Sequence, residues 1–239
     1  MKIFDIDGPL MQGLTKIADL MILNFLTILC CLPVVTAGAA ITALHYQVLK
    51  MVRKEDTYVV RGYFKAFKEN FKQATIVWLL LIVAVLFIIF DYVVIGFSEE
   101  GGIAYWYGVV IGAFAIFIAF TATMVFPIMA KFSNTTIRTI KNAMAISVLK
   151  FPQTILMLIM YAIPIFITLF FLPLLPMVLM FGFSMPVYGS AALYNKFFLK
   201  LEAQIIETQI ANGEIVEPEP DPDRIFKDEL DESLIGRDN

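Results

Sequence analysis

Four polar side chains lie in or beside long apolar stretches of this sequence, and they are its first candidates for chemistry: Asp19, Asn24, His45 and Asp91. Such groups are costly next to apolar helices, so they often mark binding or proton-transfer sites. Asp91 could bind a cation or a sugar hydroxyl, although we favour a carboxylate that faces water. Asp19 follows Lys16 at helical spacing, which favours a local ion pair. Asn24 is better suited to hydrogen bonding between helices than to binding a ligand, and His45 is a candidate for a pH-linked step.

The sequence lacks the motifs of the common catalytic sites. Its single histidine excludes the paired-histidine zinc motifs, and it contains neither a GxxxxGK[ST] phosphate loop nor a GxSxG nucleophile motif. No series of carboxylates crosses the apolar stretches, so a proton-driven pump is not indicated. We therefore expect no enzymatic activity, no cofactor and no metal ion.

A patterned surface is the other candidate for function. In the segment GYFKAFKENFKQA, residues 62–74, three phenylalanines are spaced by three and four residues: Phe64, Phe67 and Phe71. On a helix with 100° per residue, these three side chains fall within about 60° of one another. The lysines of the segment lie roughly 40–100° further round the same helix.

Two interpretations of this basic, aromatic helix stay open. The helix could lie in the headgroup layer, with its lysines toward anionic membrane lipids. It could instead offer its aromatic side chains to a protein partner, because aromatic anchors dominate many interfaces. The second interpretation predicts five partner-binding residues: Phe64, Phe67, Lys68, Phe71 and Lys72. Nucleic-acid binding is not indicated, since the basic patch is small and the C-terminal segment is acidic.

The elements that position these residues follow from composition. Hydrophobic residues make up 59% of the chain and charged residues 16%, against about 25% charged residues in soluble domains. Charged residues are absent from four long runs, 20–49, 73–90, 101–130 and 151–195. A transmembrane helix needs about 20 apolar residues, so the first three runs can each hold one span and the last can hold two. The sequence predicts an all-α, polytopic membrane helix bundle with about five transmembrane helices.

Breakers and run lengths give approximate bounds for the spans, which are 16–33, 75–97, 103–130, 151–172 and 174–198. Pro33, Thr36 and Gly38 end the first span, after which a shorter helix resumes over residues 40–50. Pro127 is expected to interrupt the third span near its end, and Pro164 lies inside the fourth.

The distribution of charge orients the spans. The loop 50–72 holds seven Lys or Arg, and the loop 131–150 holds four, whereas SEEGG (98–102) and LPLLP (172–176) hold none. Positively charged loops stay inside, so both basic loops and the C-terminus are expected on the cytoplasmic side of the cell membrane. Five spans then place the N-terminus outside, whereas a re-entrant first span would leave it inside. The second loop contains another basic amphipathic helix, residues 136–151, that leads directly into a span.

Net charge divides the chain into two parts. Residues 1–200 hold 15 Lys or Arg and 9 Asp or Glu. Residues 201–239 hold 3 Lys or Arg and 12 Asp or Glu. We interpret 1–200 as a membrane-embedded helical domain and 201–239 as an acidic, flexible cytoplasmic tail, with 201–210 briefly continuing the last helix.

Four blocks, in order, carry a resemblance: LPVVTAGAAITALHYQVLKMVR, YFKAFKENFKQATIVWL, KNAMAISVLKFPQTI and MPVYGSAALYN. Together they resemble the YesL-like family of bacterial integral membrane proteins over about residues 1–200. That family occurs mainly in Gram-positive bacteria and is typically encoded with carbohydrate ABC importers. The resemblance implies an accessory membrane subunit of an oligosaccharide importer, with the permease subunits and their ATPase as partners. The alternative is an independent small oligomeric transporter or channel.

Overall fold

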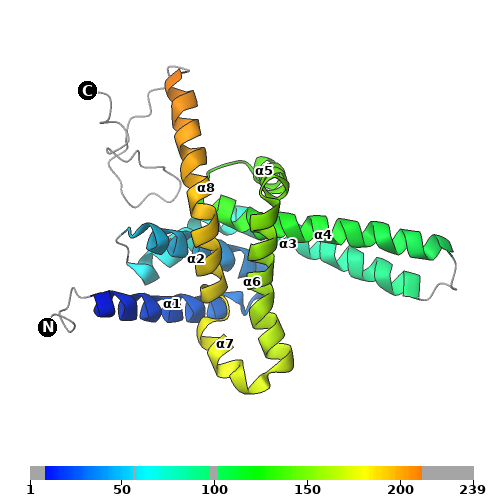
Figure 1. Ribbon diagram of the computed structural model, residues 1–239, viewed down its shortest axis with the longest axis horizontal. Helices are drawn as coiled ribbons and strands as arrows, with labels where there is room; N and C mark the ends of the chain where they lie inside the picture. Colours follow the sequence, from blue (N-terminus) through cyan, green and yellow to red (C-terminus); the bar gives the residue numbers. More distant parts are fainter. Residues whose placement is uncertain (1–8, 56–57, 97–101, 212–239) are drawn as a thin grey trace.

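The computed structural model describes residues 9–55, 58–96 and 102–211, and every regular element within these ranges is helical (Figure 1). The elements, in chain order, are α1 (Pro9–Cys31), η1 (Val34–Thr36), α2 (Ala37–Arg53), α3 (Val59–Gly96), α4 (Gly102–Lys131), α5 (Thr136–Leu149), α6 (Phe151–Phe170), η2 (Leu172–Leu174), α7 (Leu175–Phe181) and α8 (Ser184–Ala211). The predicted all-α fold is confirmed.

Several of these helices are long and apolar enough to cross a membrane. Four qualify alone, with candidate spans Leu10–Cys31, Val59–Val94, Trp106–Lys131 and Phe151–Phe170. A fifth is possible if Leu172–Phe181 and Ser184–Glu207 form one span, which is bent by 56° at its break. Length and composition thus agree with a multi-pass membrane protein of about five spans.

Helix α2 lies at the centre of the bundle, which its modest length did not suggest. Thirteen of its seventeen residues are buried, and it packs against α1, α3, α4 and α8. Small residues allow this position. A Cβ at Gly38 would lie 2.5 Å from both the Ala74 carbonyl oxygen and the Trp78 Cβ, so only glycine permits so close an approach of α3.

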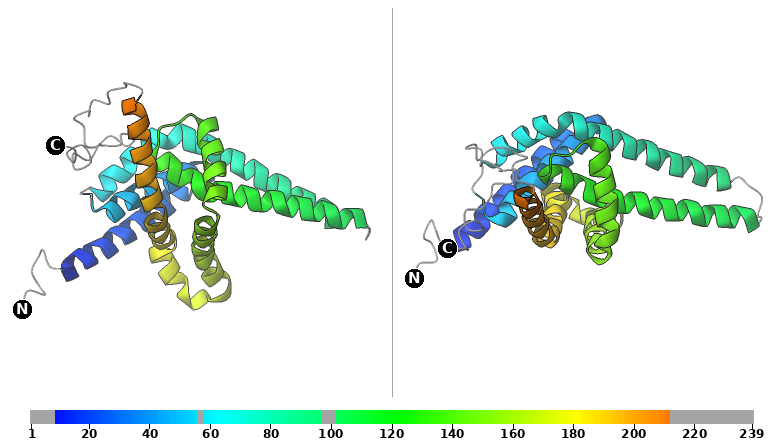
Figure 2. Two further views of the ribbon diagram at one scale, coloured as in Figure 1. Left: turned by 45° about the horizontal axis from the view of Figure 1, so that its top comes forward. Right: turned by 90° about the horizontal axis from the view of Figure 1, so that it is seen from above.

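Two helical hairpins extend from this centre. Helices α3 and α4 lie side by side and reach far beyond the other elements, while α6, α7 and α8 form a second hairpin that points in a different direction (Figures 1 and 2). Large apolar side chains cover the outer half of the first hairpin, including Phe87 and Phe90 on α3 and Phe114 on α4, each more than 60% exposed. This surface suits contact with lipid.

The second predicted span differs from the structure at its start. The basic, aromatic segment 62–74 is not a separate helix, because α3 runs without a break through 38 residues. At 1.5 Å per residue such a helix is about 57 Å long. A bilayer core takes about 30 Å, so much of α3 must lie outside the hydrocarbon. Local apolarity marks where a helix can enter lipid, but it does not mark where the helix begins.

The fifth predicted span also differs from the structure, because the helix is interrupted between Phe181, where α7 ends, and Ser184, where α8 begins. By contrast, α4 continues through Pro127 to Lys131, so the predicted interruption there is wrong. A helix of this length loses only local backbone hydrogen bonding at a proline, and its neighbours hold it together.

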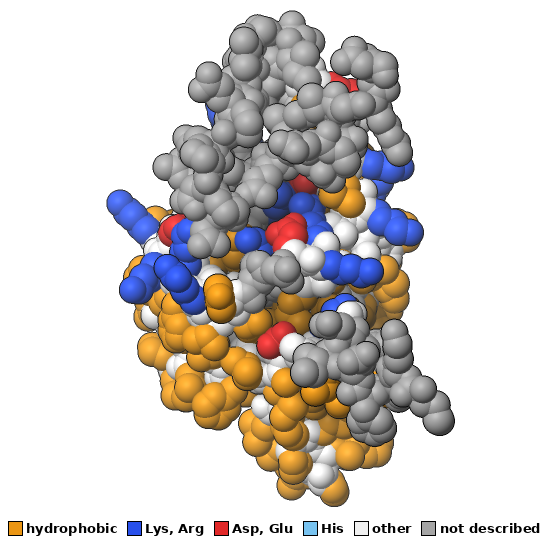
Figure 3. Space-filling model, turned by 90° about the vertical axis from the view of Figure 1, so that its left-hand side faces the viewer, with side chains coloured by type: hydrophobic (Ala, Val, Ile, Leu, Met, Phe, Trp, Pro, Cys, Tyr) orange, Lys and Arg blue, Asp and Glu red, His pale blue; other side chains and the backbone are white. Residues whose placement is uncertain are grey.

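Charged and apolar side chains occupy different parts of the surface. Lys and Arg side chains gather in a band across the upper part of the molecule, above a largely hydrophobic surface (Figure 3). The end of α2, the start of α3 and the second half of α8 supply many of the bases in the sequence. The side of the membrane on which this band lies stays a prediction.

Candidate functional site

The first half of α3 has three distinct faces. Its buried face consists of residues spaced by three and four: Tyr63, Ala66, Asn70, Ala74 and Val77. This face packs on α2, where small side chains let the two helices approach closely. The aromatic row (Phe64, Phe67 and Phe71) is next to the buried face, and the lysines follow beyond it.

The aromatic row is only partly covered. Phe64 is 40% exposed and Phe71 is 39% exposed, whereas Phe67 is half-buried and packs against the core. The rings of Phe67 and Phe71 also contact each other, with their centroids 5.6 Å apart. Lys68 and Lys72 are exposed. All five predicted partner-binding residues thus belong to one helix and border a single exposed strip.

Helix α5, the second predicted amphipathic helix, shows the same arrangement. Its buried residues are small: Thr139, Ala143 and Ser147. Some of its larger apolar side chains point outward, with Ile137 68% and Val148 51% exposed, while Ile140 and Ile146 pack against the core. The Gln73 amide of α3 donates hydrogen bonds to the Asn134 carbonyl oxygen (2.8 Å) and to the Thr139 hydroxyl (3.2 Å). These bonds tie α5 to the end of the aromatic segment.

Asn24 makes the interhelical hydrogen bonds expected from the sequence. Its Oδ1 accepts from the backbone N–H groups of Phe183 (2.7 Å) and Ser184 (3.1 Å), and its Nδ2 donates to the carbonyl oxygen of Leu179 (2.8 Å). It therefore caps the break between α7 and α8 from α1. This supplies partners for backbone groups that a helix end leaves unpaired.

His45 is buried among aromatic groups at the centre of the bundle. Its Nδ1 lies 3.2 Å from the Tyr194 hydroxyl, and its ring meets that of Tyr161 edge-on. Burial lowers the pKa of His45 to about 3. The imidazole is therefore neutral at physiological pH, and its role here is to link α2 to α8 and α6. A pH-linked step through His45 stays a prediction.

The two predicted carboxylates make no contacts of this kind. Asp19 and Lys16 are both half-buried on α1, yet no ion pair joins them, so that expectation is wrong. An ion pair between two side chains that water still reaches gains little free energy. Asp91 is half-buried near the end of α3, and the described part of the chain offers it no ion-pair partner. Its suggested cation or sugar binding stays a prediction.

One polar cluster was not anticipated from the sequence. The Arg53 guanidinium of α2 binds both carboxylate oxygens of Glu202 on α8 (2.6 and 3.2 Å) and donates to Asn195 Oδ1 (2.9 Å). Lys131 Nζ of α4 lies 3.7 Å from the same carboxylate. The side chains of Arg53, Lys131 and Glu202 are only 12%, 14% and 11% exposed. We call these four residues the ionic cluster.

The ionic cluster joins three helices at one end of the bundle. Glu202 belongs to α8, which continues past residue 200, as expected for residues 201–210, and reaches Ala211. The acidic residues of 212–239 lie outside the described residues. A signal was present in the sequence, because Glu202 is the only acidic residue between Glu100 and Glu207. Because the sequence interpretation assigned Glu202 to the acidic tail 201–239, its position apart from the other acidic residues was not used.

Comparison with known families adds one finding. A family model described as a protein of unknown function, DUF624, matches residues 20–92. The matched segment runs from α1 to near the end of α3, and it contains Asn24, His45, the aromatic row and Asp91. It covers less than a third of the chain. No curated protein and no solved structure matches.

Proposed function

We propose that this chain is an accessory membrane subunit of a carbohydrate ABC importer, which packs on the permease and contributes to its assembly or regulation. The observation that carries the proposal is the exposed aromatic row of α3. A helix that served only the fold would bury all of its aromatic side chains, but the first half of α3 buries Tyr63 and leaves Phe64 and Phe71 about 40% exposed. Aromatic side chains beside basic ones are typical of interface anchors.

The resemblance to a known family supports the same proposed function. The chain resembles the YesL-like family, whose members belong to DUF624, and the DUF624 match spans the helix that carries the aromatic row. The resemblance implies a membrane component that functions together with a sugar importer in Gram-positive bacteria. Permease subunits, together with their ATPase, are then the partners to test.

The position of the aromatic row suggests how docking would occur. The row lies on the first, basic part of α3, which precedes the charge-free stretch 73–90 of the same helix. A cytoplasmic helix of the permease could pack across Phe64 and Phe71, with Lys68 and Lys72 facing acidic groups at the rim. Truncating one such anchor costs about 2 kcal/mol or more, roughly a thirtyfold loss of affinity.

The test is co-purification of an importer permease encoded with this chain, at matched expression. Phe71→Ala is the primary variant, because its side chain is exposed enough that the fold should survive, and Phe67→Ala is the second. Phe114→Ala is the control, since this exposed residue lies on the outer half of α4. We expect both α3 variants to stay in the membrane and lose the permease, while the control retains it.

Two results would count against the proposal. Full retention of the permease by both α3 variants would show that the aromatic row is not the docking site. If the phenylalanine variants retain the permease and only Lys68→Glu and Lys72→Glu have an effect, which is weaker association with the membrane, then the helix binds anionic lipid instead. Sugar uptake by the purified chain alone in proteoliposomes would favour the independent transporter.

A further inference from the structure

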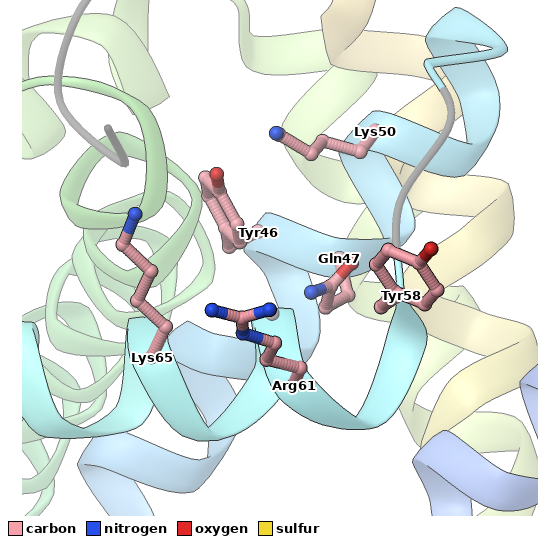
Figure 4. A pocket seen from close by; sticks show the side chains of 7 residues that line it. Tyr46, Gln47, Lys50, Tyr58, Arg61 and Lys65 are labelled. Carbon is pink, nitrogen blue, oxygen red and sulfur yellow. The ribbon is translucent and has the colours of Figure 1, made fainter. Parts of the chain in front are cut away.

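A small pocket lies between the end of α2 and the start of α3. Its volume is about 150 Å³, and it is lined by Tyr46, Gln47, Lys50, Tyr58, Arg61, Gly62 and Lys65 (Figure 4). One water molecule needs roughly 10–15 Å³ of such space. The pocket can therefore hold a polar group of several heavy atoms. We call it the basic pocket.

Three cationic side chains from two helices surround the basic pocket. Lys50 comes from the last turn of α2, and Arg61 and Lys65 come from the first turns of α3. Figure 4 shows these three side chains around the Tyr46 ring and the Gln47 amide. None of the lining residues within the described part of the chain is acidic, although Lys50 lies 3.9 Å from the Glu55 carboxylate. The chemistry of the lining therefore suits an anion.

The floor of the basic pocket is fixed by packing. Gln47 is fully buried and Tyr46 is 6% exposed. A Cβ at Gly62 would collide with the side-chain amide of Gln47, so a larger residue would require this buried amide to move. The polar floor is thus held rigidly, while Arg61 at the rim is exposed and can close on a ligand.

We infer that the basic pocket binds a phosphate group, either in the headgroup of an anionic lipid or in a free phosphate. A phosphate offers several acceptor oxygens, which match one guanidinium fork, two ammonium groups and nearby hydroxyl donors. Its surroundings also fit the headgroup level of a membrane. Tyr58 at the rim is 83% exposed, the aromatic row begins two residues beyond Gly62, and aromatic rings are enriched at that level.

This site is separate from the proposed docking surface. Its cations are Lys50, Arg61 and Lys65, whereas the docking surface uses the aromatic row with Lys68 and Lys72. Loss of one function should therefore leave the other intact.

The test compares ligands on the purified full chain in neutral detergent at constant ionic strength. Thermal unfolding is measured with inorganic phosphate, with short-chain phosphatidic acid or phosphatidylglycerol, and with phosphatidylcholine as the neutral reference. A ligand that binds the folded state raises the unfolding temperature, and the increase grows with the ratio of the ligand concentration to its Kd. Arg61→Gln with Lys65→Gln is the test variant, and Arg138→Gln with Lys141→Gln is the control that removes the same charge from exposed positions of α5 outside the pocket.

We expect an anionic ligand to raise the unfolding temperature of the wild type, and the test variant to bind it at least tenfold more weakly. The control should change affinity less than twofold. If inorganic phosphate acts alone, the source is a soluble phosphate, and if only the lipids act, the source is a headgroup. Equal losses in test and control variants would overturn the inference, because general electrostatic attraction would then explain the binding. Failure of every anion to stabilise the wild type would also overturn it. Should the double variant not fold, Lys50→Gln provides the same comparison from α2.

Discussion

Removing the carboxylate of Glu202 should destabilise the whole bundle more than any comparable change on the surface. Its side chain is 11% exposed and is the acidic partner of both Arg53 and Lys131 in the ionic cluster. Glu202→Ala would leave two nearly buried positive charges without that partner. Breaking a buried pair on one side costs about 3–5 kcal/mol, because the desolvation penalty of the remaining charge is no longer compensated.

This cost translates into a measurable shift. For a chain of this size, 1 kcal/mol lowers the unfolding temperature by about 2–4 °C. Glu202→Ala should therefore unfold about 10 °C below the wild type in detergent, as measured by the loss of monodisperse protein on heating. Glu207→Ala is the matched control, because Glu207 is an exposed residue on the same helix. It should unfold within about 1 °C of the wild type, since such surface changes are usually small.

A double variant separates lost attraction from lost packing. Combining Glu202→Leu with Arg53→Met removes the close pair, and apolar replacements of buried pairs are often neutral. We expect the double variant to recover much of the stability that either single change loses. If Glu202→Ala and Glu207→Ala unfold at the same temperature, then the ionic cluster does not hold α2, α4 and α8 together, and the reasoning fails.

Three further predictions follow from individual side chains. Asn24→Ala should lower stability by about 1–3 kcal/mol through unpaired backbone groups at the α7–α8 break, and a thermal shift no larger than that of an exposed substitution would contradict this. His45 has a folded-state pKa of about 3, so between pH 6.5 and 3 its imidazole takes up a proton in the unfolded chain but not in the folded protein. The free energy of unfolding therefore falls as the pH is lowered through this range, by up to about 1.4 kcal/mol per pH unit. His45→Gln should lack this component, so the stability gap between wild type and variant should narrow from pH 7 to 5, and a constant gap would refute the assignment. Cysteine substitutions at Ser98 or Gly101 should react with an impermeant label from outside the cell and one at Asn142 should not, and external labelling of Asn142 would reverse the orientation.

The sequence alone was enough for the class of fold. Runs without charge, each long enough to cross a bilayer, predict membrane helices because the cost of a charge in hydrocarbon is a local property of each segment. The same reasoning indicated a helical continuation beyond residue 200 and a hydrogen-bonding role for Asn24. It also identified the basic, aromatic pattern on α3, because helical spacing can be counted without a partner.

Only the tertiary structure decided how these segments meet. The first half of α3 carries a row of three phenylalanines, yet the face that it buries is the neighbouring one, which holds Tyr63, Ala66 and Ala74, and at Ala74 the backbone comes within contact of Gly38 on α2. Arg53 and Glu202 are 149 positions apart, and nothing local to either indicates their contact. The basic pocket likewise depends on residues of two helices, because α2 and α3 meet where Gly62 lies against Gln47. Side-chain packing and ion pairing depend on residues that lie far apart in the sequence, whereas apolarity and helical spacing can be determined within one segment.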